Sequence, residues 1–450
     1  MGLAWTVVVL MVAGAPVARP SATSSSTPTA TPTPTPTATA TPTALPDELT
    51  LDAALAELER QNLTLAQAAA RADEASALAR EALAPLLPSL IATGSYVRNS
   101  DAAGLSIGPP LVPVERSVII QPEEQLTGTL ALRVPLAFPT AWFDHASARG
   151  TARAASASAA AVRLQLRASF LQAAHSARAA EEITAASEAA LASAEELARS
   201  AARRVAAGTA APLDRLRAET EQVRRESDLA RARAELERTR LGLGVLLGGE
   251  RPVRVRVPEE PPAPPEGDLA AAALAARPEL AAARAQVESA EAQVRGAWAR
   301  LLPQLSASGS TFASDVAYPT GEKDGWRATL DASWALYDGG LRYGKRREAE
   351  ARRAQALAAA EALRLQVLQD VADTSRDLAV ARERLRLAEK QRALAADAQG
   401  TAQRSFEVGL ASSLDVLDAN DRRYLADVGL AEARARLATA RASLDRAVGR

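Results

Sequence analysis

Two eleven-residue stretches of this 450-residue sequence share one pattern. They read GTAAPLDRLRA at residues 208–218 and GLASSLDVLDA at residues 409–419, so both follow G-x-A-x-x-L-D-x-L-x-A. A long helix-forming segment precedes each glycine, and another follows each aspartate. Glycine ends helices because it adopts the left-handed conformation at low cost, and an aspartate in the first turn of the next helix suits the helix dipole. Each stretch therefore predicts the tip of a helical hairpin.

The composition favours long thin helices over thick globular cores. Only 3% of the residues are aromatic, 24% are charged, and alanine is abundant. The net charge of -1 provides no basic surface for nucleic acid. The absence of cysteine excludes disulfides and thiolate chemistry, and the only histidines, His145 and His175, lie far apart on one expected helix. We therefore expect that the protein is not an enzyme and that it has no cofactor and no metal site.

The first 46 residues are predicted to precede the folded part. An apolar run at residues 3–14, followed by small residues, has the size of a secretion-signal core and is too short to span a bilayer. Residues 1–18 are therefore interpreted as a signal peptide. Residues 19–46 are almost entirely Thr, Pro, Ser and Ala, a composition that predicts an extended, disordered linker.

The remaining sequence reads as one structural unit present twice, at residues 47–257 and 258–450. Each copy is expected to contain a helix, a β-hairpin, a long helix, a tip and a final helix. The expected helices before the hairpins are 51–87 and 269–302, and the expected long helices are 141–207 and 341–408. The first hairpin is expected to carry a Gly/Pro-rich loop at about 101–124, and a short strand is expected at 253–257. The two shorter helices of the first copy should stack end to end along its long helix.

The last expected strand, 326–336, carries the clearest two-faced pattern. Trp326, Leu330 and Trp334 fall on one face, whereas Arg327 and Asp331 fall on the other. Lipid on one side and water on the other require this alternation, although a half-buried sheet of a soluble protein produces it too. Four such strands in two hairpins favour a membrane barrel, with Trp326, Leu330 and Trp334 facing lipid. Four strands cannot close a barrel, so two or three copies of the chain are needed, giving eight or twelve strands.

The order of elements resembles the outer membrane efflux protein family, typified by TolC, over residues 47–450. The resemblance rests on the two tips, on the Leu-Leu-Pro strand entries at 86–88 and 301–303, and on Tyr-Asp-Gly-Gly at 337–340. It implies an α+β membrane protein that is a homotrimer. Twelve strands would form an outer-membrane β-barrel, continued by a twelve-helix α-barrel through the periplasm.

The same resemblance implies a function and a location. Such a channel is the passive exit duct of a tripartite efflux or type I secretion system in the bacterial outer membrane, and it extends into the periplasm. A periplasmic adaptor protein would couple it to an inner-membrane transporter. The alternative from another class is a structural coiled-coil spacer or adhesin of the cell envelope, which would explain the helices and the linker but not the strands.

The resemblance also assigns roles to the two tips. The adaptor would dock on small and apolar tip residues, namely Gly208, Ala210, Leu213, Leu216, Gly409, Ala411, Leu414 and Leu417. Asp415 and Asp418 lie three residues apart, so both carboxylates should point the same way, and the resemblance places the periplasmic aperture at these positions, with Asp214 as the counterpart in the first copy. Such an acidic ring favours cations. The type member has a tyrosine and an arginine that help close the aperture, where this sequence has Phe406 and Ala411.

Overall fold

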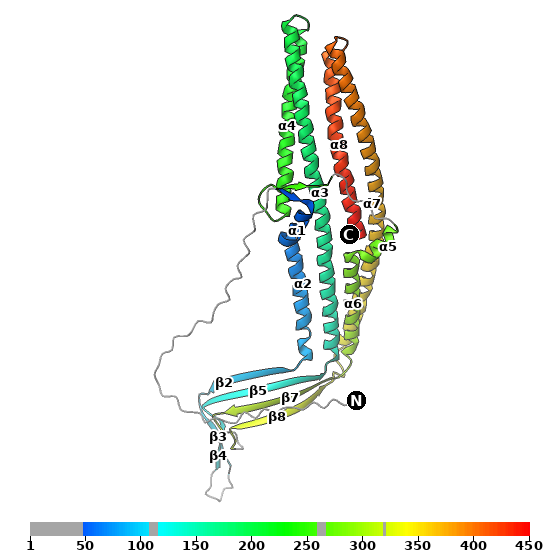
Figure 1. Ribbon diagram of the computed structural model, residues 1–450. Helices are drawn as coiled ribbons and strands as arrows, with labels where there is room; N and C mark the ends of the chain where they lie inside the picture. Colours follow the sequence, from blue (N-terminus) through cyan, green and yellow to red (C-terminus); the bar gives the residue numbers. More distant parts are fainter. Residues whose placement is uncertain (1–47, 108–115, 259–266, 318–320) are drawn as a thin grey trace, which may run out of the picture. The chain divides into compact units, whose positions relative to one another are not determined.

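The computed structural model describes residues 48–107, 116–258, 267–317 and 321–450 (Figure 1). The predicted signal peptide, 1–18, and the predicted linker, 19–46, lie outside these residues. The first half of the described chain contains β1 (Glu48–Thr50), α1 (Leu51–Gln61), α2 (Leu63–Glu81), β2 (Ser89–Arg98), β3 (Ala103–Ile107), β4 (Arg116–Gln121), β5 (Glu124–Ala137), α3 (Pro139–Ala206), α4 (Pro212–Leu246) and β6 (Arg254–Arg256). The second half contains α5 (Leu269–Ala276), α6 (Pro278–Ala299), β7 (Gln304–Ser314), β8 (Asp324–Ser333), α7 (Leu341–Glu407) and α8 (Ser413–Val448).

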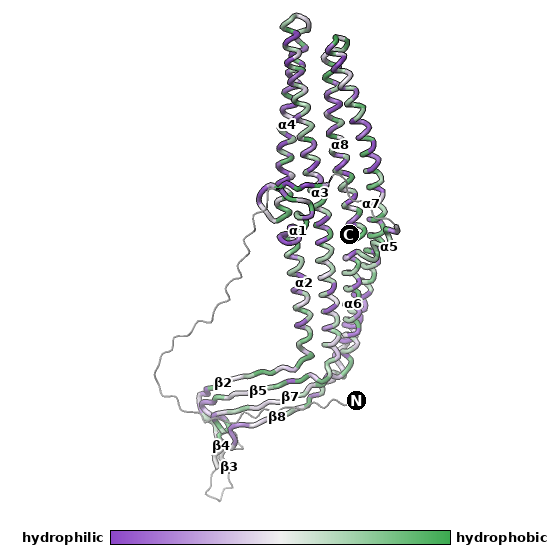
Figure 2. Tube along the Cα trace, viewed as in Figure 1, coloured by the Kyte–Doolittle hydropathy of each residue, from purple (hydrophilic) through white to green (hydrophobic). Residues whose placement is uncertain are grey.

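The long helices pack closely because the residues between them are small. α3 contacts α2, α4, α6 and α8, while α7 contacts α5, α6 and α8. Most buried residues of α3 are alanine, and Gly150 approaches α6 so closely that a Cβ there would lie 2.9 Å from the Cα of Ser289. Hydrophobic and hydrophilic residues are interleaved along every long helix (Figure 2). The expectation of thin, closely packed helices is confirmed.

Two helices expected to be continuous are broken. The expected helix 51–87 divides at Asn62, which is extended and whose side chain accepts hydrogen bonds from the backbone N–H groups of Thr64 and Leu65. The expected helix 269–302 divides at Arg277, because the following Pro278 excludes the residue before it from helical geometry. Asparagine and proline thus each begin a new helix, a pattern that apolar periodicity alone does not reveal.

The shorter helices stack end to end, as expected. The side-chain amide of Asn62 donates to the carbonyl oxygen of Leu246 at 2.8 Å, so the junction of α1 and α2 meets the end of α4. Gly248 has φ 81°, and a Cβ there would lie 2.9 Å from the carbonyl oxygen of Gln61. In the second half the end of α8 meets the end of α5 in the same way. A Cβ at Gly449, after α8, would lie 3.0 Å from the carbonyl carbon of Ala276, the last residue of α5. Both junctions leave room only for glycine.

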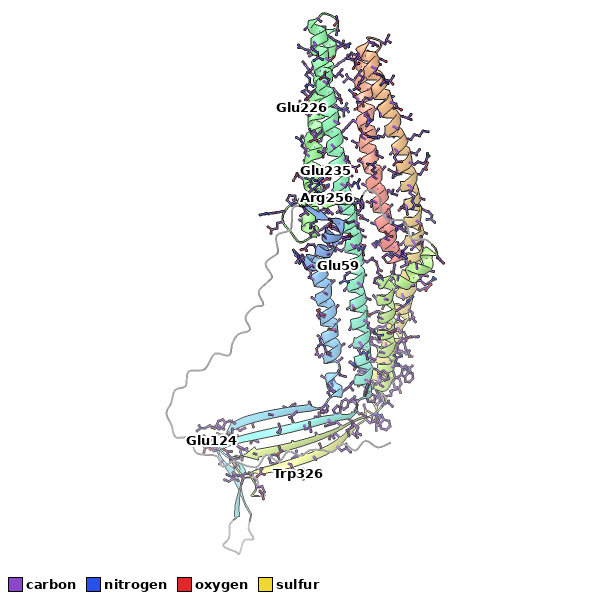
Figure 3. The ribbon with its side chains drawn as sticks, viewed as in Figure 1. Glu59, Glu124, Glu226, Glu235, Arg256 and Trp326 are labelled. Carbon is purple, nitrogen blue, oxygen red and sulfur yellow. The ribbon has the colours of Figure 1, made fainter. Side chains whose placement is uncertain are left out.

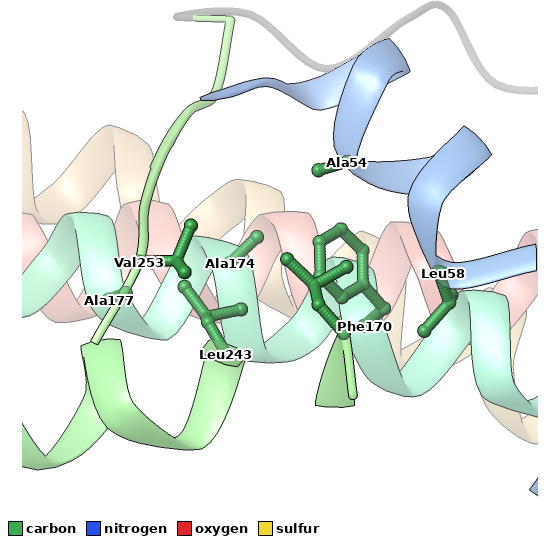
Figure 4. Close-up of a cluster of buried hydrophobic side chains, with 8 residues drawn as sticks. Ala54, Leu58, Phe170, Ala174, Ala177, Leu243 and Val253 are labelled. Carbon is green, nitrogen blue, oxygen red and sulfur yellow. The ribbon is translucent and has the colours of Figure 1, made fainter. Parts of the chain in front are cut away.

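The largest hydrophobic cluster surrounds the first junction (Figure 4). Phe170 of α3 is fully buried at its centre, and Leu58 of α1, Leu243 of α4 and Val253 surround it. Here β1 and β6 pair in parallel, with Leu49 opposite Val255. The short strand expected at 253–257 is therefore present as β6. The cluster fixes the point at which three helices and two short strands meet.

One four-stranded sheet has the order β2-β5-β7-β8, and all its pairs are antiparallel. β2 and β8 are its edges, and each has one neighbour in the described chain. The expected loop at 101–124 is not wholly irregular, because it contains the paired strands β3 and β4. β-Branched residues at 118–120 favour a strand here. The glycines and prolines nearby favour a loop, and the loop was predicted on their account.

Candidate functional site at the helical tips

The first tip joins α3 to α4 through a glycine turn. Gly208 has φ 70°, its backbone N–H donates to the carbonyl of Val205 at 3.0 Å, and that of Thr209 donates to the carbonyl of Arg204 at 2.9 Å. These bonds satisfy the last carbonyls of α3. Pro212 then begins α4, and Asp214 lies in its first turn.

The second tip uses the same turn and adds a capping box. Gly409 has φ 81°, and the backbone N–H of Leu410 donates to the carbonyl of Ser405 at 2.7 Å. Ser412 is the N-cap of α8: its hydroxyl accepts from the backbone N–H of Asp415, and its own N–H donates to Asp415 Oδ2 at 2.8 Å. Both tips are therefore closed by their own backbone, as the shared pattern predicts.

Direct contacts hold the two tips side by side. The Ser413 hydroxyl donates to Asp214 Oδ1 at 2.9 Å, which joins α8 to α4. Arg204 donates to the carbonyl oxygen of Phe406 at 3.0 Å, and its guanidinium carbon lies 3.9 Å from the centre of the Phe406 ring. Phe406 therefore receives a cation–π contact and a backbone hydrogen bond from α3, although it has no hydroxyl of its own.

Apolar packing continues the contact between the hairpins. Leu197, Ala198 and Ala201 of α3 and Ala218 of α4 form a buried cluster with Val416 of α8. Phe406 and Leu417 are partly buried against the same cluster. Leu417, one of the predicted docking residues, therefore packs partly into the contact between the hairpins.

The other predicted docking residues are more accessible. Leu213 is 53% exposed, Leu216 54% and Leu414 56%, while the backbones of Gly208 and Gly409 are exposed at the turns. Ala210 and Ala411 are half-buried. Leu410, which the sequence analysis did not select, is 85% exposed and adds the most accessible apolar side chain of the second tip.

The three predicted aperture aspartates have different partners. Asp415 caps α8, and the hydrogen bonds from the Ser412 hydroxyl and backbone hold its pKa below the ordinary value. Asp418 is 57% exposed and lies 3.0 Å from Arg422, one turn further along α8. Asp214 accepts a hydrogen bond from Ser413 and forms a local ion pair with Arg217 at 3.8 Å. Of the three carboxylates, that of Asp418 is therefore the one that no residue of the tip turns holds in place.

A buried arginine below the tips is not predictable from the sequence. The side chain of Arg225 on α4 is 3% exposed, and its guanidinium contacts Glu221 at 2.7 Å, Asp228 at 3.3 Å and Asp421 of α8 at 2.5 Å. The same guanidinium lies 4.6 Å from the centre of the Tyr424 ring. The spacing of Glu221, Arg225 and Asp228 indicates helical ion pairs, but only the fold brings the two α8 residues to them.

The sheet sorts its side chains onto an apolar and a polar face. Leu132 pairs with Leu90 and with Gly309, and Thr311 pairs with Leu130 and with Trp326, so the leucines and the tryptophan share a face. Trp326 is 80% exposed (Figure 3), and Leu330, on the same face, is 68% exposed.

Serine, threonine and charged residues predominate on the opposite face, which also carries Ile91, Val97 and Phe312. Ser308 lies between Arg133 and Thr329, and its hydroxyl lies 2.5 Å from that of Thr329. Trp334 follows the last residue of β8, and its indole N–H donates to the carbonyl of Leu301 at 3.0 Å. The strand expected at 326–336 therefore ends three residues earlier than predicted, at Ser333, and Trp334 lies just beyond it, bonded to the helix-to-strand turn. That Trp334 faces lipid stays a prediction.

Neither histidine belongs to a cluster of metal ligands. His145 bonds through Nδ1 to the carbonyl oxygen of Ala79 at 3.0 Å, and burial together with Arg178 lowers the pKa of His175 to about 4. Within the described ranges there is no group of three His, Cys, Asp or Glu residues that could hold a metal ion. Among the helices of the described residues, none is both long enough and apolar enough to cross a membrane.

Comparison with known proteins identifies the family to which this arrangement of paired long helices and antiparallel β-hairpins belongs. The model of the family described as outer membrane efflux protein matches residues 54–249 and 269–450, most of the chain. The chain belongs to this family. It is an outer membrane efflux channel, located in the bacterial outer membrane and extending into the periplasm. The predicted class and location are confirmed in preference to a spacer or adhesin, and the family is one of channels rather than enzymes.

Solved structures share the fold. The outer-membrane channel OprN is 24% identical, with a TM-score of 0.74 over 88% of this chain and 89% of that chain. VceC of Vibrio cholerae is 22% identical, with a TM-score of 0.73 over 88% of this chain and 95% of that chain. The open state of MtrE of Neisseria gonorrhoeae is 21% identical, with a TM-score of 0.72 over 88% of both chains. A search of curated proteins found no match.

Proposed function

We propose that three copies of this chain form one channel. Its β-barrel has twelve strands, and its helical barrel has twelve helices around its circumference, with two shorter helices stacked end to end counted as one. The observation that carries the proposal is the four-stranded sheet with two open edges and one apolar face. In lipid an open edge leaves backbone groups without partners, so β8 of one copy must pair with β2 of the next. Three copies give a closed, symmetric assembly with no edge left.

The oligomeric state tests this proposal. The full chain, extracted in a neutral detergent, should elute as a particle of three protomers by light scattering. It should migrate as a trimer in SDS and dissociate to a monomer only on heating. A dimeric particle would favour the eight-stranded alternative, and a stable monomer would exclude barrel closure between copies.

We propose further that the channel is the exit duct of a tripartite efflux or type I secretion system, whose periplasmic adaptor binds the two tips. Three features support this assignment: closed glycine turns, exposed leucines on both tips, and the contacts that hold the tips together. Leu213, Leu216 and Leu414 would supply apolar anchors, and the glycines would let partner backbone approach closely. The adaptor would in turn connect the duct to an inner-membrane transporter.

We also propose that the acidic residues of the second tip line the periplasmic aperture. Asp418 is the main candidate because it is exposed and its partner, Arg422, is itself 71% exposed. Asp415 adds charge close by while capping α8. Asp214 acts in this proposal chiefly by holding Ser413, which sets the position of the second tip against the first.

A further inference from the structure

The polar face of the four-stranded sheet carries three charged residues in a narrow belt. Arg133 of β5 pairs with Ser308 of β7, and Ser308 pairs with Thr329 of β8. Arg327 and Asp331 lie two residues before and two residues after Thr329, so they share its face. At about 3.4 Å per residue, the belt covers about 14 Å of β8. Arg133 lies level with its middle.

The arginines of this belt are not neutralised by carboxylates of the same chain. Neither Arg133 nor Arg327 forms an ion pair with any residue that the structure describes. The one carboxylate of the belt, that of Asp331, accepts a hydrogen bond from the Thr329 hydroxyl at 3.2 Å. Every other residue that β2, β5, β7 and β8 place on this face is uncharged, and most are serine or threonine. Each chain therefore contributes two positive charges and one negative charge.

The strand order spaces the arginines evenly, an argument that rests on the proposed trimer. In the order β2-β5-β7-β8, Arg133 lies on the second strand and Arg327 on the fourth. When β8 of one copy pairs with β2 of the next, every second strand around the barrel carries an arginine. Three copies then bring six arginines and three aspartates to one belt, which holds three more positive charges than negative ones.

The belt lies at the level of residues that are predicted to face lipid. On β8, Arg327 directly follows Trp326, and Asp331 directly follows Leu330. The charges therefore have an apolar layer behind them and water in front of them. Walls of low dielectric constant concentrate the field of charges in the water that they enclose, so an ion inside the barrel experiences this excess more strongly than it would at an open surface.

We propose that this arginine belt makes the membrane-spanning part of the duct favour anions, and that it attracts cargo bearing a carboxylate, phosphate or sulfonate group. Rings of charged side chains set the ion preference of pores, and guanidinium groups bind such oxyanions through charge-assisted hydrogen bonds. The preference is opposite to that of the acidic residues proposed for the periplasmic aperture. The duct therefore has two charge filters in series, one at the tips and one in the barrel.

Planar-bilayer recordings of the full-length channel in a KCl gradient test the proposal, because the reversal potential gives the chloride-to-potassium permeability ratio. Arg133→Gln/Arg327→Gln should lower this ratio at least twofold, and Asp331→Asn should raise it. The triple variant should still lower it, because the arginines outnumber the aspartates. Arg133→Lys/Arg327→Lys is the matched control, since it keeps both charges and should leave the ratio nearly unchanged.

Chemical labelling of the assembled channel gives a second measurement that does not depend on how the glutamine variants fold. The chain has no cysteine, so Arg327→Cys introduces the only thiol. A methanethiosulfonate reagent forms a disulfide with this thiol and releases methanesulfinate. A reagent that carries a trimethylammonium group restores the positive charge and should raise the ratio, whereas one that carries a sulfonate should lower it.

Three results would overturn the proposal in a protein that still conducts as a trimer. They are an unchanged ratio in Arg133→Gln/Arg327→Gln, an unchanged or raised ratio in the triple variant, and equal ratios after the two labels. An unaltered protein that forms no conducting trimer would instead contradict the proposed function itself.

Discussion

Arg225 on α4 and Asp421 on α8 form a nearly enclosed ion pair between the two hairpins, with Nη2 and Oδ1 2.5 Å apart. Glu221 and Asp228 contact the other guanidinium nitrogens. Asp421 lies eight residues beyond Ser413, about two helical turns from the tip. Separating the hairpins at this level therefore takes Asp421 away from Arg225, while Glu221 and Asp228, which are on α4 like Arg225, stay with it.

Replacing Arg225 should loosen the contact between hairpins. Arg225→Ala leaves three carboxylates without their shared cation. Breaking a buried ion pair costs about 3–5 kcal/mol, an upper limit here because Asp421 is 31% exposed. We expect a lower thermal unfolding temperature and, in planar bilayers, a higher conductance than that of the unaltered channel.

Arg224→Ala is the matched control for this change. Arg224 also contacts Asp421, at 3.4 Å, but its side chain is 56% exposed, and such surface pairs contribute about 0–1 kcal/mol. Its unfolding temperature and conductance should stay close to those of the unaltered protein. If both variants behave alike, the enclosed pair has no special role.

Asp418 should contribute more than Asp415 to ion preference. Asp418→Ala removes an exposed carboxylate without disturbing the start of α8, whereas Asp415→Ala also removes the capping box. In planar-bilayer recordings, Asp418→Ala should lower the cation preference and divalent block, and the double variant should lower both further. Unchanged conductance, cation preference and divalent block in the double variant would show that the aspartates do not line the aperture.

The cap of α8 should make stability depend on pH only in strongly acidic solution. The pKa of Asp415 is lowered in the folded protein, so its contribution is present above the unfolded-state pKa and is lost as pH falls through the folded one. The unaltered protein should therefore melt at a higher temperature than Asp415→Asn at pH 7, and the difference should begin to shrink below about pH 4 and vanish once the pH lies below the folded-state pKa. A difference that persists at pH 2 would mean that the carboxylate charge is not what stabilises the cap.

The two faces of β8 should tolerate charge very differently. Leu330 lies on the apolar face and Asp331 on the polar one. An arginine facing lipid near mid-bilayer costs about 2–4 kcal/mol, whereas the same residue facing water costs little. Leu330→Arg should therefore reduce the heat-modifiable oligomer in outer-membrane fractions, and Asp331→Arg should leave it nearly unchanged. Similar losses in both variants would mean that the apolar face does not meet lipid.

Charge on the exposed tip leucines should block adaptor binding without blocking assembly. Leu213→Glu and Leu414→Glu change accessible side chains and leave the glycine turns intact, whereas any residue in place of Gly409 would strain a backbone at φ 81°. We expect crosslinking to the cognate adaptor to fall at least tenfold while the oligomer persists. Val223→Glu, on the exposed side of α4 beyond the tip, is the control. Normal crosslinking and export in both tip variants would place the docking surface elsewhere.

Much of this fold could be predicted because its signals are local. The glycine at each tip, the Leu-Leu-Pro entries and the period-2 strands each specify a turn or element within a few residues. The helix breaks at Asn62 and Arg277 were missed because alanine-rich periodicity continues through both positions. The β3–β4 pair was missed because glycines and prolines surround it.

The candidate site was only partly predictable for a different reason. Positions of Asp214, Asp415 and Asp418 at helix starts follow from sequence, but their partners do not. Ser413 reaches Asp214 across 199 residues of chain, and Arg225 reaches Asp421 across 196. Such contacts depend on how two hairpins pack, which no spacing within either hairpin encodes. The repeat boundaries and the roles of the tips stay predictions.

The end-to-end junctions at Gly248 and Gly449 tie the lengths of separate helices to one another. α3 has 68 residues, about 102 Å of helix, and α2 and α4 share that span with 19 and 35 residues. Seven residues added to α3 alone would carry the first tip about 10 Å beyond its present level and pull Asp214 away from Ser413. α4 would have to grow equally to return to its junction, and α7 and α8 would have to follow to keep the tips in contact. The reach of this duct into the periplasm can therefore change only through matched insertions or deletions in four helices at once.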